Sequence, residues 1–178
     1  MRLFIALKTN LDKGKIFSYE KSLMHTVSGV KWVEKENLHL TLKFLGETSM
    51  ETKEDVSFYL SKIAETTSHF SFQYSGIDAF PDIRRARVIF VSVRNGKKIV
   101  SLMERVDDLF GPLGFKKEKS YIPHLTLGRV KNGYVDLKRF NLPQFKSEDV
   151  EATGILLVKS TLTKNGPIYQ HIAEFDFG

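Results

Sequence analysis

The sequence predicts a domain of mixed helices and strands that is built from two similar lobes. Its 178 residues are typical of one domain rather than several. Strand and helix signals alternate along the chain, and no Pro/Ser-rich linker or low-complexity segment divides it. The tetrapeptide His-Leu-Thr-Leu occurs twice, at 39–42 and at 124–127, so the copies are 85 residues apart. We therefore expect residues 1–178 to form a single bilobal domain in which each lobe supplies one motif strand.

The first half of the chain opens with an apolar run that predicts a strand, and a helix pattern follows it with Asn10 as its expected N-cap. The segment with the first motif alternates strictly between apolar and polar residues. Thr48 and Glu51 have the spacing of a capping box at the start of a second helix. The expected segments are strands at 3–7, 30–34 and 38–45, a helix over 10–24 and a helix from 48 onward.

The middle of the chain is mostly strand-like, and a third helix and further strands follow it. Pro81 lies in a charged stretch that predicts a loop between two strands. Apolar residues at helical spacing then predict a third helix over 97–110, which ends at Gly111 and Pro112. The expected strands are 69–77, 86–93, 121–130, 150–160 and 168–176, with turns at 131–133 and 164–167.

Composition excludes several classes of protein. The chain has no cysteine, which excludes a disulfide scaffold, a thiolate zinc site, an iron–sulfur cluster and a cysteine nucleophile. Hydrophobic residues make up 42% and charged residues 27%, a balance typical of a folded protein rather than a disordered one. Because no segment resembles a membrane span or a signal peptide, we expect a soluble cytoplasmic protein with no membrane contact. The net charge of +6 mildly favours a polyanionic partner.

The repeated tetrapeptide carries the chemistry. Residues two apart on a strand point to the same face, so His39 and Thr41 project together while the leucines beside them fill the other face. The same holds for His124 and Thr126. A single His-x-Thr on a strand is usually a solvated face or a cross-strand pair. Two near-identical copies, one in each half, instead favour a polar cleft in which two imidazoles and two hydroxyls surround one small anion.

Three kinds of chemistry could use two His-x-Thr pairs. Two imidazoles without a nearby carboxylate or thiolate make an incomplete catalytic zinc site, so we expect no metal and no other cofactor. A threonine nucleophile would need an activating arrangement that neither motif shows. Acid–base catalysis at a phosphate fits best, because one imidazole can accept a proton while its partner donates one. The hydroxyls would hold phosphate oxygens as charge develops in the transition state.

With these motifs the chain resembles the 2H phosphoesterase superfamily, and more narrowly the bacterial and archaeal RNA 2′,3′-cyclic phosphodiesterases, also called 2′-5′ RNA ligases. The resemblance runs through RLFIAL at the start, WVEKENLHLTLKFLGE and YIPHLTLGRV around the motifs, and KSTLTKNGPIY near the end. It implies a bilobal α+β fold with two antiparallel-rich sheets in a pseudo-twofold arrangement that line a central cleft, with helices packed outside.

The resemblance also implies an activity and a role for each motif residue. The expected reaction is metal-independent hydrolysis of 2′,3′-cyclic phosphate ends of RNA, or of cyclic nucleotides, to 2′-phosphomonoesters, and a reversible 2′-5′ RNA ligase activity can accompany it. In that scheme His39 is the proton donor to the departing 3′ oxygen, and His124 is the proton acceptor from the attacking water. Thr41 and Thr126 hold the phosphate, and Arg129 matches an arginine of the active site.

The position of Arg129 depends on the local backbone. It lies five residues past His124, so strict alternation would send it to the opposite face. A bend or bulge at Gly128 would turn it into the cleft, which is a common role of glycine in a strand. Without that bend, Arg129 is a surface charge.

Two aromatic residues and a lysine near the first motif also have two interpretations each. Phe44 and Phe4 are substrate-binding candidates that could stack a nucleobase, with a place in the core as the alternative. Lys43 shares the parity of His39 and Thr41, so we expect it at the cleft mouth or in solvent. A cluster of arginines at 84, 85 and 87 could guide RNA phosphates toward the cleft or belong to a solvated loop.

Three histidines lack a threonine two residues later, and we expect them at the surface or in structural roles. They are His25, His69 and His171. Two other functions stay open: another activity of the superfamily, such as opening of ADP-ribose cyclic phosphate or cleavage of 2′-5′ linkages, and an RNA-end-binding module without turnover. Intact histidines in both motifs argue against the binding module. We expect a monomer.

Overall fold

The computed structural model describes all 178 residues. Three helices and eight strands are joined by short loops and three 3-10 helices. The helices are α1 (Lys13–Met24), α2 (Met50–Glu65) and α3 (Lys97–Phe110). The strands are β1 (Arg2–Thr9), β2 (Val30–Trp32), β3 (Thr41–Glu47), β4 (Phe70–Phe80), β5 (Val88–Arg94), β6 (His124–Val130), β7 (Glu148–Thr163) and β8 (Gly166–Asp176). None of the helices is both long and apolar enough to cross a membrane.

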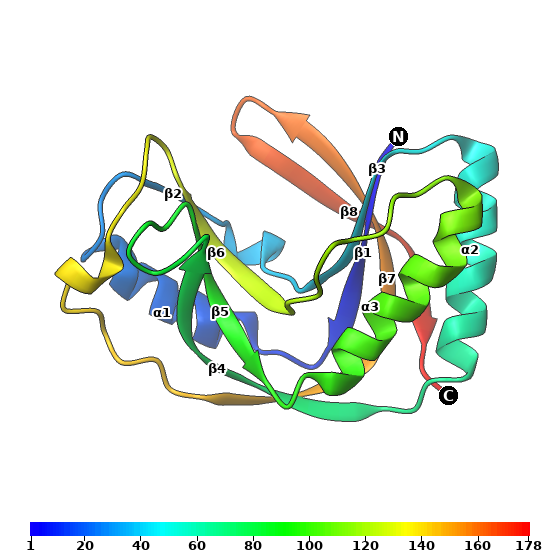
Figure 1. Ribbon diagram of the computed structural model, residues 1–178, viewed down its shortest axis with the longest axis horizontal. Coiled ribbons are helices and arrows are strands. Elements are labelled where there is room, and N and C mark those ends of the chain that lie inside the picture. The colour runs from blue at the N-terminus through cyan, green and yellow to red at the C-terminus, as the bar shows by residue number, and fades with distance from the viewer.

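The strands form one antiparallel sheet in the order β2-β6-β5-β4-β7-β1-β3, and β8 pairs with β7. This confirms the α+β class with antiparallel strands. The two expected sheets are joined into one, because Phe70–Tyr74 of β4 pair with Glu148–Ala152 of β7. On either side of this junction the sheet divides into a first lobe (β1, β3, β7, β8) and a second lobe (β2, β4, β5, β6), seen at the right and left of Figure 1.

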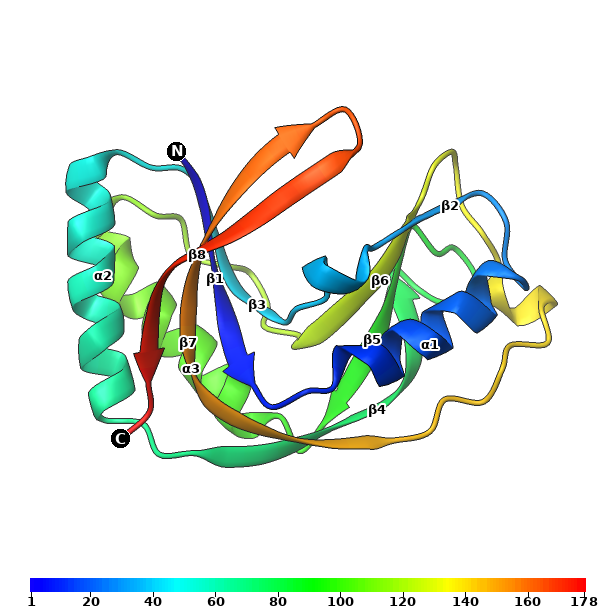
Figure 2. The same ribbon diagram turned by 180° about the vertical axis from the view of Figure 1, so that it is seen from behind.

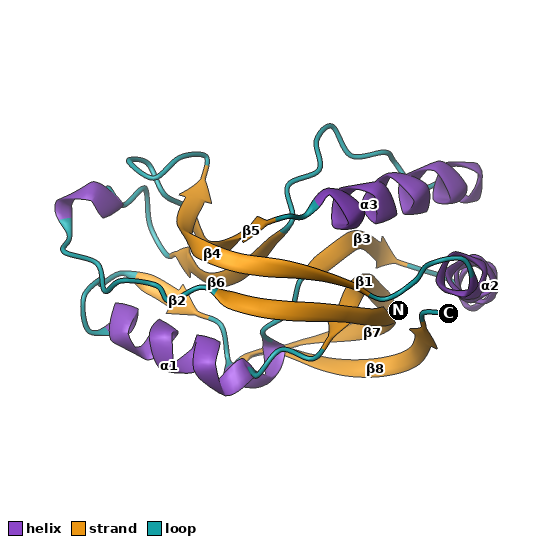
Figure 3. Ribbon diagram, turned by 90° about the horizontal axis from the view of Figure 1, so that it is seen from below, coloured by secondary structure: helices purple, strands orange, loops and turns teal.

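The helices do not stay with the strands that precede them. α1 follows β1 of the first lobe but packs against β2 in the second. α3 follows β5 of the second lobe but packs against β3 and α2 at the first. Viewed from below, α1 and α3 lie on opposite sides of the strands (Figure 3). Each lobe is therefore covered by a helix that enters from the other.

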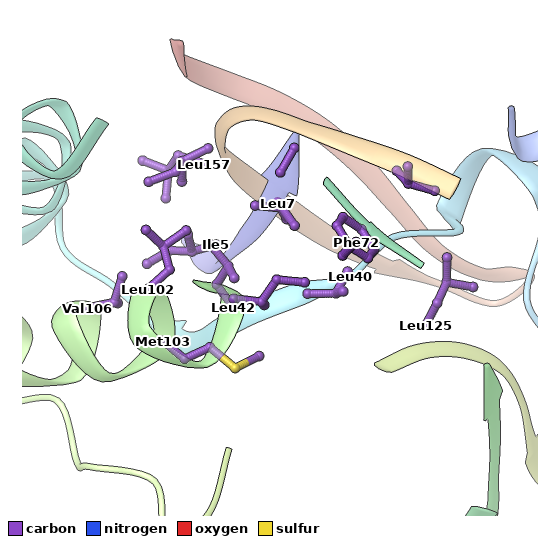
Figure 4. Close-up of a cluster of buried hydrophobic side chains, with 14 of the residues drawn as sticks. Ile5, Leu7, Leu40, Leu42, Phe72, Leu102, Met103, Val106, Leu125 and Leu157 are labelled. Atoms are coloured by element: carbon purple, nitrogen blue, oxygen red, sulfur yellow. The ribbon is translucent and has the colours of Figure 1, made fainter. Parts of the chain in front are cut away.

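The core sits between the sheet and these helices and includes the alternate leucines of both motifs. Leu40, Leu42 and Leu125 are at most 4% exposed and belong to the same buried cluster as Ile5 of β1 and Val106 of α3 (Figure 4). Burial of a leucine side chain contributes about 1.5–3 kcal/mol. The apolar face of each motif is thus fixed by the core, and its polar face is turned away from it.

Two expected helix caps are wrong. The side chain of Asp12, not Asn10, caps α1 by accepting a hydrogen bond from the Gly14 N–H at 2.9 Å. The Asn10 side chain instead accepts from the backbone N–H of Glu151 in β7 at 2.9 Å. At α2 the cap is Ser49, which accepts from the Thr52 N–H at 3.1 Å, so Glu51 is one position too early for a capping box.

The hairpin of β7 and β8 is longer than expected, because both strands continue to a tight turn at 164–165. Its outer part projects beyond the other strands of the first lobe, at the top of Figures 1 and 2. The Asn37 side chain, just before the first motif, donates a hydrogen bond to the Pro167 carbonyl of the hairpin at 3.0 Å. The hairpin is thereby tied to the segment that carries the first motif.

Candidate active site

The two motifs meet at the junction of the lobes. Leu40 and Leu125 form an antiparallel bridge between the segments that hold the two tetrapeptides. In an antiparallel pair the partner numbers have a constant sum, so His39 lies opposite Thr126, and His124 lies opposite Thr41. All four side chains share the face opposite the bridging leucines. The two histidines are diagonal neighbours, a relation that places such positions about 7–8 Å apart.

A β-bulge follows each motif and reverses the side-chain parity. In the β1–β3 pair the register steps over Leu42, and in the β5–β6 pair it steps over Leu127. After the first bulge Lys43 points inward and is 4% exposed, so the expectation that it lies at the cleft mouth or in solvent is wrong. Phe44 points outward instead and is 61% exposed. The residues stepped over, Leu42 and Leu127, are the fourth residues of the two tetrapeptides, so the bulges lie at equivalent places.

The second bulge decides the orientation of Arg129. It places Arg129 opposite Val88 of β5, on the same face as His124 and Thr126, and Arg129 is exposed. Of the two alternatives for Arg129, the structure has the one with a bulge, which lies at Leu127 beside Gly128. Lys31 of β2 lies opposite Arg129 on the other side of β6. These two cations stand beside the motif face and favour an anion there.

The His39 ring is held at both nitrogens. Nδ1 lies 2.5 Å from the Asn37 carbonyl, which can only accept, so Nδ1 carries the hydrogen. Nε2 of the neutral ring can then accept from the Thr41 hydroxyl at 2.8 Å. Burial lowers the pKa of His39 to about 4, opposed by the Asn37 hydrogen bond and assisted by the charges of Lys13 and His124.

The His124 ring repeats the arrangement of His39 at Nδ1. Its Nδ1–H donates to the Ile122 carbonyl, also two residues earlier, at 2.7 Å. Burial and the charge of Arg129 lower its pKa, whereas the Ile122 hydrogen bond raises it. In both motifs the carbonyl fixes the tautomer, so that Nε2 is the nitrogen left for proton exchange.

Aromatic rings surround both imidazoles. Phe4 and Tyr169 lie 4.8 Å and 5.3 Å from the His39 ring, between centroids. Phe80 and Phe90 lie 5.0 Å and 5.1 Å from the His124 ring. Phe4 is only 3% exposed, in line with the core alternative, and its ring packs against the His39 ring. These rings exclude water from the imidazoles and so favour their neutral forms.

Both motifs lie within segments that match one known protein family. A family model described as LigT like Phosphoesterase matches the chain twice, over residues 12–90 and 91–169. The chain belongs to the LigT-like phosphoesterase family. Each matched copy contains one of the two tetrapeptides, as the internal repeat predicts.

Similar proteins cover the whole chain. A protein of Methanocaldococcus jannaschii, named RNA 2′,3′-cyclic phosphodiesterase, is 39% identical over 98% of this chain and 100% of the relative. One of Aquifex aeolicus with the same name is 35% identical over 100% of this chain and 98% of the relative. The crystal structure of TT0787 of Thermus thermophilus has a TM-score of 0.85 and 26% identity, covering 99% of this chain and 98% of that one. The resemblance seen in the sequence is confirmed.

A structure of LigT from Escherichia coli complexed with 3′-AMP shares the fold. It has a TM-score of 0.79 at 22% identity and covers 99% of this chain and 97% of that one. The bilobal arrangement of a LigT-like phosphoesterase is therefore kept at low sequence identity.

His39 also borders a pocket that is lined in part by residues the motifs did not predict. This pocket of about 270 Å³ opens beside His39 and is lined by residues of β1 and β8. Its apolar floor includes Phe4 and Val158, and Tyr169 and Lys13 stand at its wall. No local motif marks Tyr169 or Lys13, because each reaches the site only through the pairing of distant segments.

The other three histidines lie away from the motif face or at its edge. His25 is exposed, and His69 forms an exposed pair with Glu151 at 3.1 Å. His171 pairs with Glu174 at 3.8 Å and lines the pocket beside His39. Arg84, Arg85 and Arg87 are exposed, and the guanidinium groups of the last two lie 5.6 Å and 5.4 Å from the Tyr134 ring.

Proposed function

We propose that this LigT-like phosphoesterase hydrolyses 2′,3′-cyclic phosphate ends of RNA, and 2′,3′-cyclic nucleotides, to 2′-phosphomonoesters without a metal ion. The observation that carries the proposal is the antiparallel apposition of two His-x-Thr motifs, each with Nδ1 held by a carbonyl. The names of the full-length relatives support the substrate class.

The roles follow from the reaction. The water oxygen attacks phosphorus and loses a proton to Nε2 of His124, while the bond from phosphorus to the 3′ oxygen breaks and Nε2 of His39 donates a proton to that oxygen. Thr41 and Thr126 donate hydrogen bonds to the non-bridging oxygens, whose charge Arg129 and Lys31 balance. When a 5′-hydroxyl replaces water, the same groups form a 2′-5′ linkage.

The donor role requires His39 to be protonated although its pKa is lowered to about 4. The positive charges of Lys13 and His124 disfavour the protonated form of His39. A phosphate anion between the rings has the opposite effect, because a negative charge within about 4–6 Å favours the charged form of an imidazole. Substrate therefore brings the proton-donating state with it. The Thr41 hydroxyl, which faces His39 Nε2, then turns to a phosphate oxygen.

Outside the phosphate site, Phe44 is the group that can stack a nucleobase, because it is exposed and lies on the motif face beside Phe4, at 6.0 Å between ring centroids. Its exposure leaves the ring accessible to a nucleobase. Arg129 stands at the equivalent position after the second motif.

Product analysis tests the proposal. Oligonucleotides with 2′,3′-cyclic phosphate ends, incubated with EDTA, should yield 2′-phosphate ends only.

His39→Ala and His124→Ala should each lower kcat by about 10²–10⁴-fold. The double variant should lose less than the product of the two single losses, because both groups act in one displacement. Thr41→Val or Thr126→Val should cost roughly 10- to 150-fold, the equivalent of about 1.5–3 kcal/mol. His69→Ala is the matched control. Activity that vanishes in EDTA and returns with zinc, or either histidine variant above a tenth of the wild-type rate, would overturn the mechanism.

A further inference from the structure

A buried ion pair links the two motifs through α3. Lys43, two residues after Thr41, reaches the Asp107 carboxylate, and their side chains are 2% and 1% exposed. Isolated charges are rarely buried to this degree, since desolvation costs several kcal/mol per ion unless every group is paired. Here the pairing is complete, and it extends to a third segment.

That third segment is the chain from 114 to 123, which has no regular structure and leads directly into His124. The Lys43 ammonium donates to the Lys116 carbonyl at 2.8 Å. The second oxygen of Asp107 accepts from the Glu118 N–H at 2.8 Å and from the Tyr121 hydroxyl at 2.7 Å. Residues 116–120 are otherwise exposed, so these bonds define the path of the segment.

The protonation states of Asp107 and Tyr121 favour these hydrogen bonds to the segment before His124. Burial alone would raise the pKa of Asp107, but hydrogen bonds from Lys43, the Glu118 N–H and Tyr121 outweigh it and hold that pKa below its usual value. The bond to Asp107 raises the pKa of the Tyr121 hydroxyl to about 12, so the hydroxyl remains a donor. Each bond to the carboxylate is therefore charge-assisted.

The segment matters because it contains the carbonyl that orients His124. Ile122 follows Tyr121, and its carbonyl accepts the His124 Nδ1–H. The first motif has a different support: the Asn37 carbonyl belongs to a 3-10 helix, and the Asn37 side chain is tied to the hairpin. The second motif has no such helix before it, and the Asp107 anchor stands in its place.

We propose that Asp107 and Tyr121, together with Lys43, are positioning residues that hold the Ile122 carbonyl and thereby aim Nε2 of His124 at the substrate. The same bonds fix the position of the second motif relative to the first, since Lys43 extends from the strand of Thr41. The catalytic consequence rests on the proposed function, whereas the orientation of His124 does not.

Tyr121→Phe tests this inference, because it removes one hydrogen bond to Asp107 and keeps the ring. Tyr19→Phe is the matched control, since it also removes one tyrosine hydrogen bond, from α1 to the Pro143 carbonyl at 2.7 Å. NMR titration of the two motif imidazoles is the first readout. In Tyr121→Phe the pKa of His124 should fall, because a carbonyl that accepts from Nδ1–H stabilises the imidazolium, while His39 titrates as in the wild type.

Turnover of a 2′,3′-cyclic nucleotide is the second readout. We expect kcat of Tyr121→Phe to fall about tenfold with little change in KM, since a misaligned base affects the chemical step rather than binding. Tyr19→Phe should change neither readout. An unchanged His124 titration, or an equal shift of both imidazoles, would overturn the positioning role. A selective shift of His124 with unchanged kcat would support that role and instead contradict His124 as the base.

Discussion

The ring of each motif histidine is fixed through Nδ1, so a proton can be exchanged only through Nε2. This symmetry does not by itself assign donor and acceptor, because the two environments are nearly equivalent. The assignment of His39 as donor has a consequence that depends on the leaving group. A leaving group that needs no proton makes the general acid dispensable and leaves the general base essential.

Bis(p-nitrophenyl) phosphate has such a leaving group. With this substrate His39→Ala should lose less than about tenfold, against about 10²–10⁴-fold with a cyclic nucleotide. His124→Ala should lose activity on both substrates. Steady-state rates of the folded variants give the comparison, with His69→Ala as control. If the good leaving group rescued His124→Ala and not His39→Ala, the two roles would be exchanged.

The pH dependence of the reaction follows from the same two rings. The active form needs one protonated and one neutral imidazole, so kcat/KM should be bell-shaped in pH. Burial lowers both pKa values, to about 4 for His39. The protonated form is lost as pH rises through them, so the maximum of kcat/KM should lie on the acid side of the ordinary histidine pKa of about 6.5. Bound phosphate raises the pKa of the donor, so the profile of kcat should lie at higher pH. A maximum of kcat/KM above about pH 7.5 would contradict this.

Strict alternation of side chains along a strand predicted which motif residues share a face, but it gave the wrong face for the residue that follows the first tetrapeptide. The bulge after each motif is the reason. In the second motif Gly128 indicated that a bulge was possible, which left two orientations open for Arg129, and the bulge at Leu127 selects the one on the motif face. In the first motif Lys43 occupies the same place, and no residue there marks a bulge. The buried partner of Lys43 is Asp107, 64 residues away, which no local pattern reveals.

Gly128 has a packing role that a substitution should expose. A Cβ at this position would lie 2.6 Å from Val30 Cγ1 and 3.2 Å from the Lys31 carbonyl oxygen. Gly128→Ala should therefore destabilise the protein by about 1–3 kcal/mol through overpacking between β6 and β2. Gly76→Ala is the control, since nothing lies within 4 Å of its added carbon. Urea denaturation of both variants measures the difference, and equal midpoints would refute the close approach of β2.

Helix α1 carries a buried acid that the catalytic scheme does not use. Both carboxylate oxygens of Glu20 are buried without a hydrogen-bond partner, and burial, together with the charge of Glu34, raises its pKa to about 8. Between pH 4.5 and 8 the folded state holds a proton that the unfolded state releases, so stability should fall as pH rises, by up to about 1.4 kcal/mol per unit. Glu20→Gln should flatten this slope in urea denaturation across the same pH range. Parallel profiles for the two proteins would contradict the buried acid.

In the whole molecule, helices α1 and α3 cross from one lobe to the other, which only the tertiary structure reveals. Periodicity located all three helices, because each has an apolar stripe, but it could not show that α1 and α3 each cover the lobe opposite the strand before them. The internal repeat did predict a shared site, because two copies of one motif strand that meet antiparallel place their polar faces together. Tyr169 and Lys13 were missed for the opposite reason, since each is a single residue without a repeat partner.

We expect two arginines outside the phosphate site to bind upstream phosphates of the proposed RNA substrate. Arg87 precedes Val88, the partner of Arg129, and lies five residues before Ser92, the partner of His124, which corresponds to roughly 17 Å along β5. Arg85 and Arg87 both stack on Tyr134, which holds their guanidinium groups in place. A cyclic mononucleotide cannot span this distance, whereas the upstream phosphates of an oligonucleotide can.

Salt dependence should separate these two substrates. Each phosphate neutralised on a single strand contributes about −0.7 to the slope of log affinity against log salt, so the double variant Arg85→Gln/Arg87→Gln should make the slope for an oligonucleotide shallower by roughly 1.4. Turnover of a 2′,3′-cyclic nucleotide should be unchanged, because the chemistry at the motifs is intact. The control is Lys62→Gln/Lys97→Gln, which removes the same charge from exposed positions on α2 and α3. It should leave the salt slope for the oligonucleotide and the turnover of the cyclic nucleotide as in the wild type. If the arginine and lysine variants gave the same slope, net charge alone would account for the salt effect, and the RNA would not pass over Tyr134.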